Sequence, residues 1–244
     1  MIPPILYASD KQKPFADELA NKIGTNSSSN IKFLDLPHLA LSESGLSFFH
    51  PEARSSKKFQ IDFDSGSTHW RVKRANHEKL IKKALGKSEE PLNILDCTAG
   101  LLQDTLLFLS LGHKVTALEQ SCILFYLLQD GISRSDKKSI FVNLDLIHDN
   151  VRSYASMTEG FDIIYFDPMY SHGKKTALSS GQLEYIAKIL ETESIKNDPK
   201  QDFDVLQLIP AKKMIVKRPI KADSFSSQIN YQVLGKTTRF DVYI

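Results

Sequence analysis

The sequence predicts an α/β protein whose main domain contains a mostly parallel sheet that ends in an antiparallel hairpin. Three observations support this fold class. Strand-like and helix-like segments alternate from residue 92 onward, two strand-like segments end the chain with no helix between them, and a unit of different pattern comes first. We therefore expect a small N-terminal α+β subdomain over residues 1–67 and a larger domain over residues 68–244.

Length and composition limit the class of protein. The 244 residues suffice for one large domain with a small appendage, and a content of 41% hydrophobic and 25% charged residues is ordinary for a globular protein. The chain has no run of 18 apolar residues and no secretory signal, so we expect a cytoplasmic protein with no membrane partner. Cys97 and Cys122 are too few for a disulfide framework and lack clustered histidines, so no metal is expected. The oligomeric state stays open.

The N-terminal segments read as short elements. Residues 5–8 form an apolar run, which predicts a strand. Residues 14–23 have helical spacing, and Gly24 is placed to end that helix. Further strand candidates are residues 31–36, 39–49 and 58–63.

The alternating region follows a basic helix candidate at residues 72–85. The predicted strands are residues 92–95, 114–118, 141–148, 161–166 and 214–216, and the predicted helices are 101–111, 121–133, 181–193 and 203–209, with a short helix after residue 148. This rhythm predicts parallel βαβ units with right-handed crossovers. Residues 229–234 and 239–244 predict the final antiparallel hairpin around Gly235.

The turn after the first strand of this series has the composition of a ligand site. Asp96 ends an apolar run, and small residues follow as far as Gly100, where a helix begins. In an open α/β sheet this turn faces the ligand crevice. Because the later glycines of the dinucleotide pattern are absent, a nucleoside ligand fits better than NAD. An ordinary strand-to-helix turn is the alternative.

Polar residues also end the next two strands. Glu119 is placed to accept hydrogen bonds from two ribose hydroxyls, unless it only caps the helix that starts near residue 121. His148, Asp149 and Asn150 follow the third strand and are candidates to hold an adenine edge, with helix capping as the alternative.

The fourth strand ends in Asp167-Pro168-Met169-Tyr170, the most specific feature of the sequence. Proline restricts both itself and Asp167, so this loop is stiff. A carboxylate and a carbonyl on such a loop can accept both hydrogens of an exocyclic amine, and Tyr170 can stack on the base. The alternative is an Asp-Pro turn with Tyr170 in the core.

Positive charge is concentrated in two segments. Residues 54–83 carry a net charge of +6 and residues 211–221 a net charge of +5, in a chain whose total is +2. Such clustering favours a polyanionic partner, although two solvated faces that never meet would look the same. The basic residues expected to line one RNA-facing surface are Arg71, Lys73, Arg74, Lys212, Lys213, Lys217 and Arg218.

Together these motifs resemble class I S-adenosylmethionine-dependent methyltransferases, which have a Rossmann-like sheet. Within that class they are similar to the family of ribosomal RNA small subunit methyltransferase J. The matching segments are residues 96–104, Leu146-Ile147-His148, Asp167-Pro168-Met169-Tyr170, Val216-Lys217-Arg218-Pro219, residues 239–243, and Ile61-Asp62-Phe63 with Gly66 and His69. The family usually has Gly and Arg where Leu102 and Gln103 stand.

The resemblance implies S-adenosylmethionine as the cofactor and methyl transfer to the N2 amine of a guanine in small-subunit (16S) ribosomal RNA. The implied partner is that RNA or the 30S subunit. Family contacts to the cofactor fall on Gln103, Asp104, Glu119, Gln120, Asn150 and Asp167, to which the strand-end positions add Asp96, Gly100 and Asp149. The catalytic candidates are Asp167, Pro168 and Tyr170. Two alternatives remain. The protein could be a methyltransferase that acts on another amine, in DNA adenine or protein glutamine, or a non-catalytic RNA-binding protein with a methyltransferase core.

Overall fold

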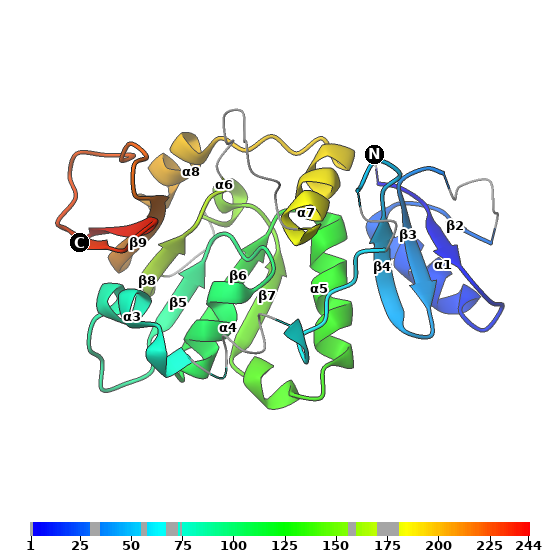
Figure 1. Ribbon diagram of the computed structural model, residues 1–244, viewed down its shortest axis with the longest axis horizontal. Coiled ribbons are helices and arrows are strands. Elements are labelled where there is room, and N and C mark those ends of the chain that lie inside the picture. The colour runs from blue at the N-terminus through cyan, green and yellow to red at the C-terminus, as the bar shows by residue number, and fades with distance from the viewer. Residues whose placement is uncertain are drawn as a thin grey trace. The chain divides into compact units, whose positions relative to one another are not determined.

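The computed structural model of this chain describes residues 2–29, 35–54, 58–66, 73, 75–155, 160–169 and 181–244 (Figure 1). They form two compact units. The first contains a four-stranded sheet and helices α1 (Lys13–Ile23), α5 (Cys122–Arg134) and α7 (Gly181–Thr192), and the second contains a seven-stranded sheet. The predicted α/β class is confirmed, whereas the boundary expected between residues 67 and 68 stays a prediction.

The sheet of the first unit mixes parallel and antiparallel strands. Its order is β2 (Ser27–Ser28), β1 (Ile5–Tyr7), β3 (His38–Ser42) and β4 (Gly45–Phe49). Strand β1 is parallel to both of its neighbours, whereas β3 and β4 form an antiparallel hairpin. As the sequence predicts, α1 ends at Gly24, whose φ of 73° is left-handed.

Two strand predictions in this unit are wrong. Residues 39–49 form the hairpin of β3 and β4 rather than one strand, and Gly45, with a φ of 104°, supplies the backbone conformation that the reversal requires. Residues 58–63 form a single bridge, between Phe59 and Phe48, instead of a strand. Of the strand predicted at 31–36, residues 31–34 lie outside the described residues.

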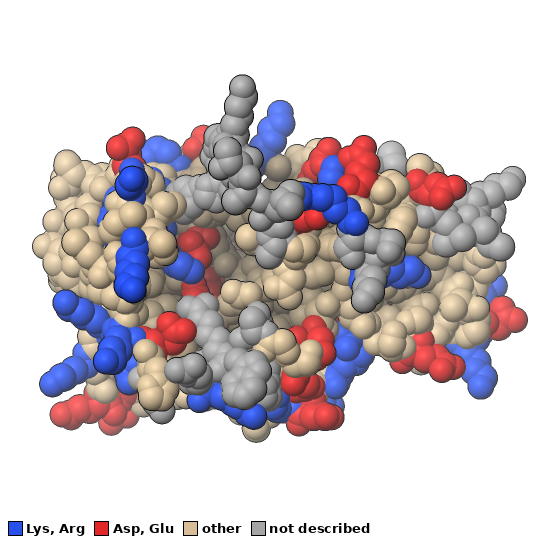
Figure 2. Space-filling view, in the orientation of Figure 1, with Lys and Arg blue, Asp and Glu red and all other residues tan. Residues whose placement is uncertain are grey.

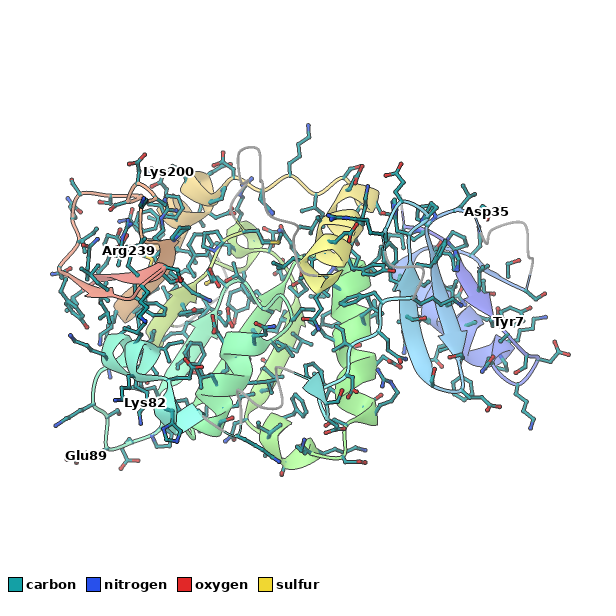
Figure 3. The ribbon with its side chains drawn as sticks, in the orientation of Figure 1. Tyr7, Asp35, Lys82, Glu89, Lys200 and Arg239 are labelled. Carbon is teal, nitrogen blue, oxygen red and sulfur yellow. The ribbon has the colours of Figure 1, made fainter. Side chains whose placement is uncertain are left out.

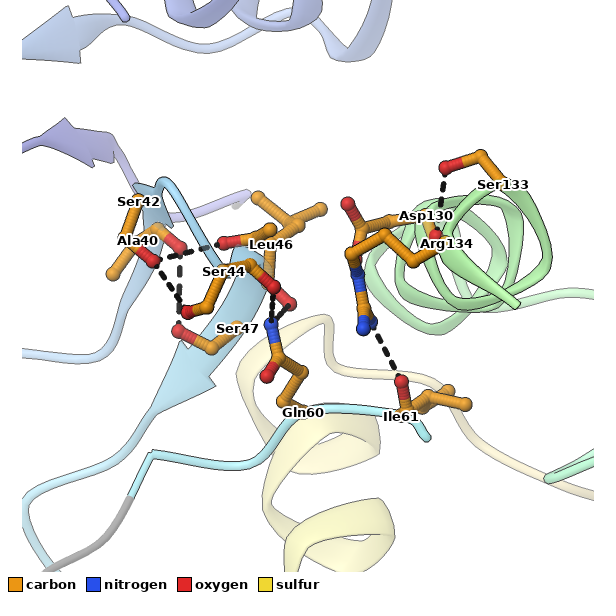
Figure 4. Close-up of polar contacts among 11 residues, drawn as sticks. Ala40, Ser42, Ser44, Leu46, Ser47, Gln60, Ile61, Asp130, Ser133 and Arg134 are labelled. Atoms are coloured by element: carbon orange, nitrogen blue, oxygen red, sulfur yellow. Dashed lines mark hydrogen bonds and ion pairs between the residues drawn. The ribbon is translucent and has the colours of Figure 1, made fainter. Parts of the chain in front are cut away.

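Beyond the bridge at Phe59, side chains hold the extended segment after β4 (Figure 4). The Arg134 guanidinium on α5 donates to the Ile61 carbonyl at 2.6 Å, and the Gln60 side-chain amide donates to the Ser44 carbonyl at 2.7 Å. Gly131 of α5 allows the close approach, because a Cβ there would lie 3.0 Å from the Ile61 side chain. These long-range contacts explain why a local pattern did not identify the segment correctly.

The sheet of the second unit contains the strands predicted from residue 92 onward. Its strands are β5 (Asn93–Asp96), β6 (Lys114–Glu119), β7 (Leu144–His148), β8 (Phe161–Phe166), β9 (Ala211–Pro219), β10 (Tyr231–Leu234) and β11 (Thr238–Tyr243). They are ordered β10-β11-β9-β8-β5-β6-β7. Strands β5 to β9 are mutually parallel, and β11 lies antiparallel between β9 and β10. The predicted parallel sheet with an antiparallel C-terminal hairpin is confirmed.

The helical segments of this unit are η2 (Ala75–His77), α3 (Lys79–Leu85), α4 (Gln103–Ser110), η3 (Lys138–Phe141), α6 (Val151–Tyr154) and α8 (Pro199–Leu206). Helix α8 begins before the predicted residue 203, because Asp198 caps it by accepting from the Gln201 N–H and Pro199 suits its first turn.

Alternation along β8 distributes its side chains over both faces of the sheet. Tyr165 packs edge-on against Phe108 of α4, with ring centroids 4.9 Å apart. Ile164 and Phe166 join a buried cluster that contains Phe203 of α8. Because neighbouring residues of a strand point to opposite faces, α4 and α8 cover opposite sides of the sheet.

A buried ion pair fixes the C-terminal hairpin. The Arg239 guanidinium, labelled in Figure 3, pairs with Asp241 at 2.8 Å and is 5% exposed. It also donates to the carbonyls of Pro219 and Ile220, at 3.0 and 2.9 Å. Arg239 therefore holds the chain that leaves β9 against the start of β11.

Helix α3 runs antiparallel to β9. At its C-terminal end, the Lys213 ammonium donates to the Leu85 carbonyl at 2.8 Å, near the start of β9. At its N-terminal end, Leu80 lies against Gly235, where a Cβ would be 2.7 Å from the leucine side chain. Because the turn at Gly235 lies beside the carboxyl end of β9, α3 begins near that edge of the sheet.

Candidate functional site

The carboxyl ends of β5, β6, β7, β8 and β9 meet at one edge of the seven-stranded sheet. The sequence-predicted residues Asp96, Glu119, Asp149 and Asp167 lie at these strand ends. Figure 2 shows a hollow with acidic side chains in its depth, beside the ends of β5 and β8. This edge is the candidate functional site, as expected for an open α/β sheet.

Asp96 stabilises the turn after β5 by accepting hydrogen bonds. Its side chain is 1% exposed, and its two oxygens accept hydrogen bonds from the Thr98 N–H at 3.1 Å and the Thr105 hydroxyl at 2.5 Å. Burial raises the pKa of Asp96 to about 7, although both hydrogen bonds oppose that rise. The structure thus places Asp96 inside the protein, where it fixes the turn.

The turn contains two residues with left-handed backbones. Gly100 has a φ of 51° and Leu102 a φ of 56°. A left-handed leucine is uncommon because its Cβ crowds the backbone. Leu102 is also fully buried, so core packing compensates for this conformation. The family that this sequence resembles usually has glycine at this position. The positive φ explains that preference, because glycine adopts such a backbone without strain.

Glu119 ends β6 beside that turn. Its carboxylate is largely buried, and its Oε2 accepts a hydrogen bond from the Gly100 N–H at 3.2 Å. The alternative role, as the cap of α5, belongs to Ser121, whose hydroxyl accepts from the Leu124 N–H. Gln120 is exposed, and its side-chain amide donates to Asn197 at 2.6 Å.

Asn150 carries out the helix capping that the sequence offered as its alternative role, and Asp149 bonds to the same cap region. The Asn150 side chain accepts from the N–H groups of Arg152 and Ser153 and so caps α6. Asp149 accepts from the Asn150 N–H at 2.7 Å and from the Ser153 hydroxyl. Asn150 is exposed at the end of β7, so its position at the candidate site is as expected.

Asp167 is held from both its backbone and its side chain. Its N–H donates to the Thr98 hydroxyl oxygen at 2.8 Å, and its Oδ2 pairs with the Lys217 ammonium at 2.7 Å. Pro168, the next residue, is buried. Tyr170, the expected stacking residue, lies outside the described residues.

Lys217 joins Asp167 to a second carboxylate. Its ammonium also donates to Oδ2 of Asp104 at 2.7 Å, and the Tyr165 hydroxyl donates to the same oxygen at 2.5 Å. Burial alone would lower the pKa of Lys217, but the carboxylates of Asp104 and Asp167 outweigh it and hold that pKa well above its usual value. Burial and the same carboxylates raise the pKa of the Tyr165 hydroxyl.

The other residues predicted to contact RNA are spread over separate places. Arg218 is 6% exposed, and its guanidinium lies 3.9 Å from the ring centroid of Phe225. Lys212 is exposed but pairs with Asp162 at the amino edge of the sheet, opposite the site. Lys213 holds the end of α3. The prediction that these lysines share one surface with Lys217 is therefore wrong.

Two further predicted residues, Arg71 and Arg74, lie outside the described part of the chain. Lys73 is described and exposed. Gln103 opens α4, directly after the left-handed Leu102.

Sequence reasoning missed Thr98, Thr105 and Tyr165. One signal was available for Tyr165, because it lies two residues before Asp167 and so shares its face of the strand. No local signal identifies Thr98 or Thr105. Thr98 bonds to Asp167 at the end of another strand, and Thr105 bonds to Asp96 across the turn after β5.

The described residues include no group of three or more His, Cys, Asp or Glu side chains placed to hold a metal ion. Across the same described ranges, no helix combines the length and the apolar character needed to cross a membrane.

Comparisons with known proteins place this architecture among methyltransferases. A family model described as "Putative SAM-dependent methyltransferase", where SAM is S-adenosylmethionine, matches residues 21–244. Ribosomal RNA small subunit methyltransferase J of Francisella philomiragia is 34% identical over 198 residues, covering 77% of this chain and 80% of the relative. The protein of the same name from Thioalkalivibrio sulfidiphilus is 29% identical, covering 98% of this chain and 96% of the relative.

A solved structure is similar over nearly the whole chain. The crystal structure of a SAM-dependent methyltransferase from Neisseria gonorrhoeae has a TM-score of 0.70 and 25% sequence identity, and the match covers 99% of this chain and 95% of that one. The similarity therefore includes both compact units.

Proposed function

Because the chain belongs to the family of SAM-dependent methyltransferases that includes ribosomal RNA small subunit methyltransferase J, we propose that it methylates the N2 amine of a guanine in small-subunit (16S) ribosomal RNA. Membership confirms the resemblance seen in the sequence and the dependence on S-adenosylmethionine. The target base, the atom that is methylated and the role of each site residue belong to the proposal.

The strand ends fit this cofactor by their chemistry. Glu119 offers a carboxylate, which accepts hydrogen bonds, at the strand end where a ribose diol binds in such folds. Beside it, a Cβ at Gly100 would meet, among the described residues, only the Thr98 carbonyl within 4 Å, at 3.7 Å, so this part of the turn leaves room for a ligand. When bound, S-adenosylmethionine supplies a methyl group on a sulfonium that is already a good leaving group.

The observation that carries the proposal is the placement of Asp167. Its backbone is bonded to the turn after β5 and its carboxylate is ion-paired, so both the acid and the following Pro168 carbonyl are held on a stiff loop. In the proposal, these two oxygens accept the two hydrogens of the guanine amine and turn its nitrogen lone pair toward the methyl group. Orientation then accounts for most of the acceleration. The amine proton is released to water, and no strong base is required.

The RNA is proposed to approach over lysines at the same edge of the sheet. Lys221 follows β9 and Lys236 lies in the turn between β10 and β11; both are exposed, and neither forms an ion pair with a carboxylate among the described residues. Lys79, at the start of α3, is exposed beside that turn. Phosphate contacts of this kind position a nucleic acid without selecting its sequence.

The proposal is tested with purified protein, S-adenosylmethionine carrying a deuterated methyl group, and either 16S RNA or 30S subunits lacking the modification. Digestion and mass spectrometry should find one labelled N2-methylguanosine per RNA, and ribosomal RNA from cells without the gene should lack it. Asp167→Ala should abolish the label, whereas Asp162→Ala, at the amino end of the same strand, should retain it. Label in DNA adenine or protein glutamine instead would establish the alternative substrate class. RNA binding without calorimetric binding of S-adenosylmethionine, and without transfer to RNA, DNA or protein, would identify a non-catalytic RNA-binding protein on the same core.

A further inference from the structure

Lys217 occupies a position that phosphate binding does not explain. Its side chain is 24% exposed, and its ammonium lies 2.7 Å from a carboxylate oxygen of Asp104 and 2.7 Å from one of Asp167. These partners come from the first turn of α4 and from the loop after β8. One ammonium therefore connects three segments that surround the candidate site.

Strand geometry explains why Lys217, rather than its neighbour, reaches this place. In the register of β8 and β9, Tyr165 pairs with Ile215, so both side chains point to the face covered by α4. Lys217 lies two residues beyond Ile215 and shares that face. Arg218 points to the opposite face, where it stacks on Phe225.

We propose that Lys217 is a positioning residue that keeps the Asp167 carboxylate ionised and oriented toward the substrate amine, with Asp104 as its second anchor. This inference rests on the proposed function, in which Asp167 binds that amine. The ammonium binds Oδ2 of Asp167, which limits rotation of the carboxylate and sets the direction of its other oxygen.

The charge balance of the site requires such a cation. The titratable groups that face one another here are Asp96 on β5, Asp104 on α4, Tyr165 and Asp167 on and after β8, and Lys217 on β9. On the adjoining β11, Phe240 pairs with Lys217. Like-charged carboxylates that share a site raise one another's pKa, and a nearby cation lowers it. Without Lys217, the pKa of Asp104 or Asp167 should rise, and a protonated Asp167 would be a weaker acceptor for an amine.

The same contacts argue against a phosphate as the partner of Lys217. Two carboxylates already surround the ammonium, and a phosphate that approached it would meet both of them. Like-charge repulsion of that kind disfavours binding. The exposed Lys221 and Lys236 carry no such neighbours among the contacts described, so they suit phosphate better.

The test compares Lys217→Met, which removes the charge, with Lys217→Arg, which keeps it, in the full-length protein. Lys212→Met is the control, because Lys212 lies on the same strand at the opposite edge and is 82% exposed. Three quantities are measured: the pH dependence of the single-turnover methylation rate, the titration of the aspartate carboxyl carbons by NMR without cofactor, and the salt dependence of RNA affinity. Asp104→Asn and Asp167→Asn assign the NMR signals.

In Lys217→Met, a carboxyl of Asp104 or Asp167 should titrate about 1–3 pH units higher than in wild type, the usual effect of an adjacent cation. The acidic limb of the pH–rate profile should also shift to higher pH. The affinity for RNA and its dependence on salt concentration should stay unchanged. Lys217→Arg should keep the wild-type titration and recover most of the rate, whereas Lys212→Met should match wild type throughout.

The proposal is overturned if Lys217→Met leaves the carboxyl titration unchanged or if its main effect is a weaker, flatter salt dependence of RNA binding. A folded Lys217→Arg protein with a shifted carboxyl titration would also overturn it, which keeps the test decisive if the Met variant does not fold. Absence of guanine methylation by the wild-type protein would refute the proposed function alone, because the NMR titration does not depend on substrate.

Discussion

The hydroxyl oxygen of Thr98 accepts a hydrogen bond from the backbone N–H of Asp167 at 2.8 Å. This bond joins the turn after β5, where we propose that the cofactor binds, to the loop after β8, where we propose that the amine binds. The neighbouring strands reinforce it, because the Cys97 N–H donates to the Tyr165 carbonyl at 2.9 Å. The distance between this turn and this loop is thus set by hydrogen bonds between adjacent strand ends.

Thr98→Val should therefore loosen Asp167. Valine has nearly the same shape but cannot accept the Asp167 N–H. Because this hydrogen bond is only part-buried, leaving the donor unsatisfied should cost about 1 kcal/mol, the low end of the range for buried donors. We expect a lower free energy of unfolding by about that amount and a lower single-turnover rate, measured by urea denaturation and by RNA methylation. Thr98→Ser keeps the hydroxyl and should behave like wild type. Equal rates for the valine and wild-type proteins would show that the bond does not position Asp167.

Glu119→Ala should weaken S-adenosylmethionine binding by about 1–3 kcal/mol, the cost of losing a charged hydrogen-bond partner. Isothermal calorimetry measures this directly. Glu90→Ala is the matched control, since Glu90 is exposed in the loop that precedes the amino end of β5. Unchanged cofactor affinity in Glu119→Ala would leave that residue with a structural role only, through its bond to Gly100.

The exposed lysines beside the site give a prediction about RNA. Replacing Lys221 and Lys236 together by Ala should weaken RNA binding and reduce the salt slope by about one unit per lost phosphate contact at most. Replacing Lys114 and Lys212, which are exposed at the amino edge of the same sheet, should change neither quantity. Filter binding over a range of salt concentrations makes the comparison. Equal losses in the two double variants would indicate a general charge effect and no defined RNA path.

Asp96 makes stability depend on pH. Its pKa is about 7 in the folded protein and 3.8 in the reference state, so the folded protein binds more protons between about pH 4 and pH 7. The free energy of unfolding should therefore decrease, by a few kcal/mol at most, as the pH rises from about 4 to about 7. Asp96→Asn cannot ionise, so its stability relative to wild type should increase from about pH 4 to pH 7. Urea unfolding at several pH values tests this, and parallel curves would contradict it.

Local patterns in the sequence determined most elements of the larger sheet and the strand ends that carry the site. Asp96, Glu119 and Asp167 each end a short apolar run, and the carboxyl ends of parallel strands must meet at one edge. Hydrophobic periodicity and turn residues are properties of neighbouring positions, so they can be read without the fold. The single strand predicted over residues 39–49 was wrong because it included the polar run from Ser42 to Gly45, which forms the turn of the hairpin, where Gly45 has a positive φ.

Tertiary structure alone decided what the neighbouring bases Lys217 and Arg218 do. The sequence shows two adjacent positive charges, and positive charge by itself favours a polyanion. Strand alternation sends one side chain between Asp104 and Asp167 and the other onto Phe225. Asp104 lies 113 residues from Lys217 along the chain. The ionic partner of a side chain is a long-range property, because the order of strands in the sheet, and not the distance in sequence, determines which residues meet.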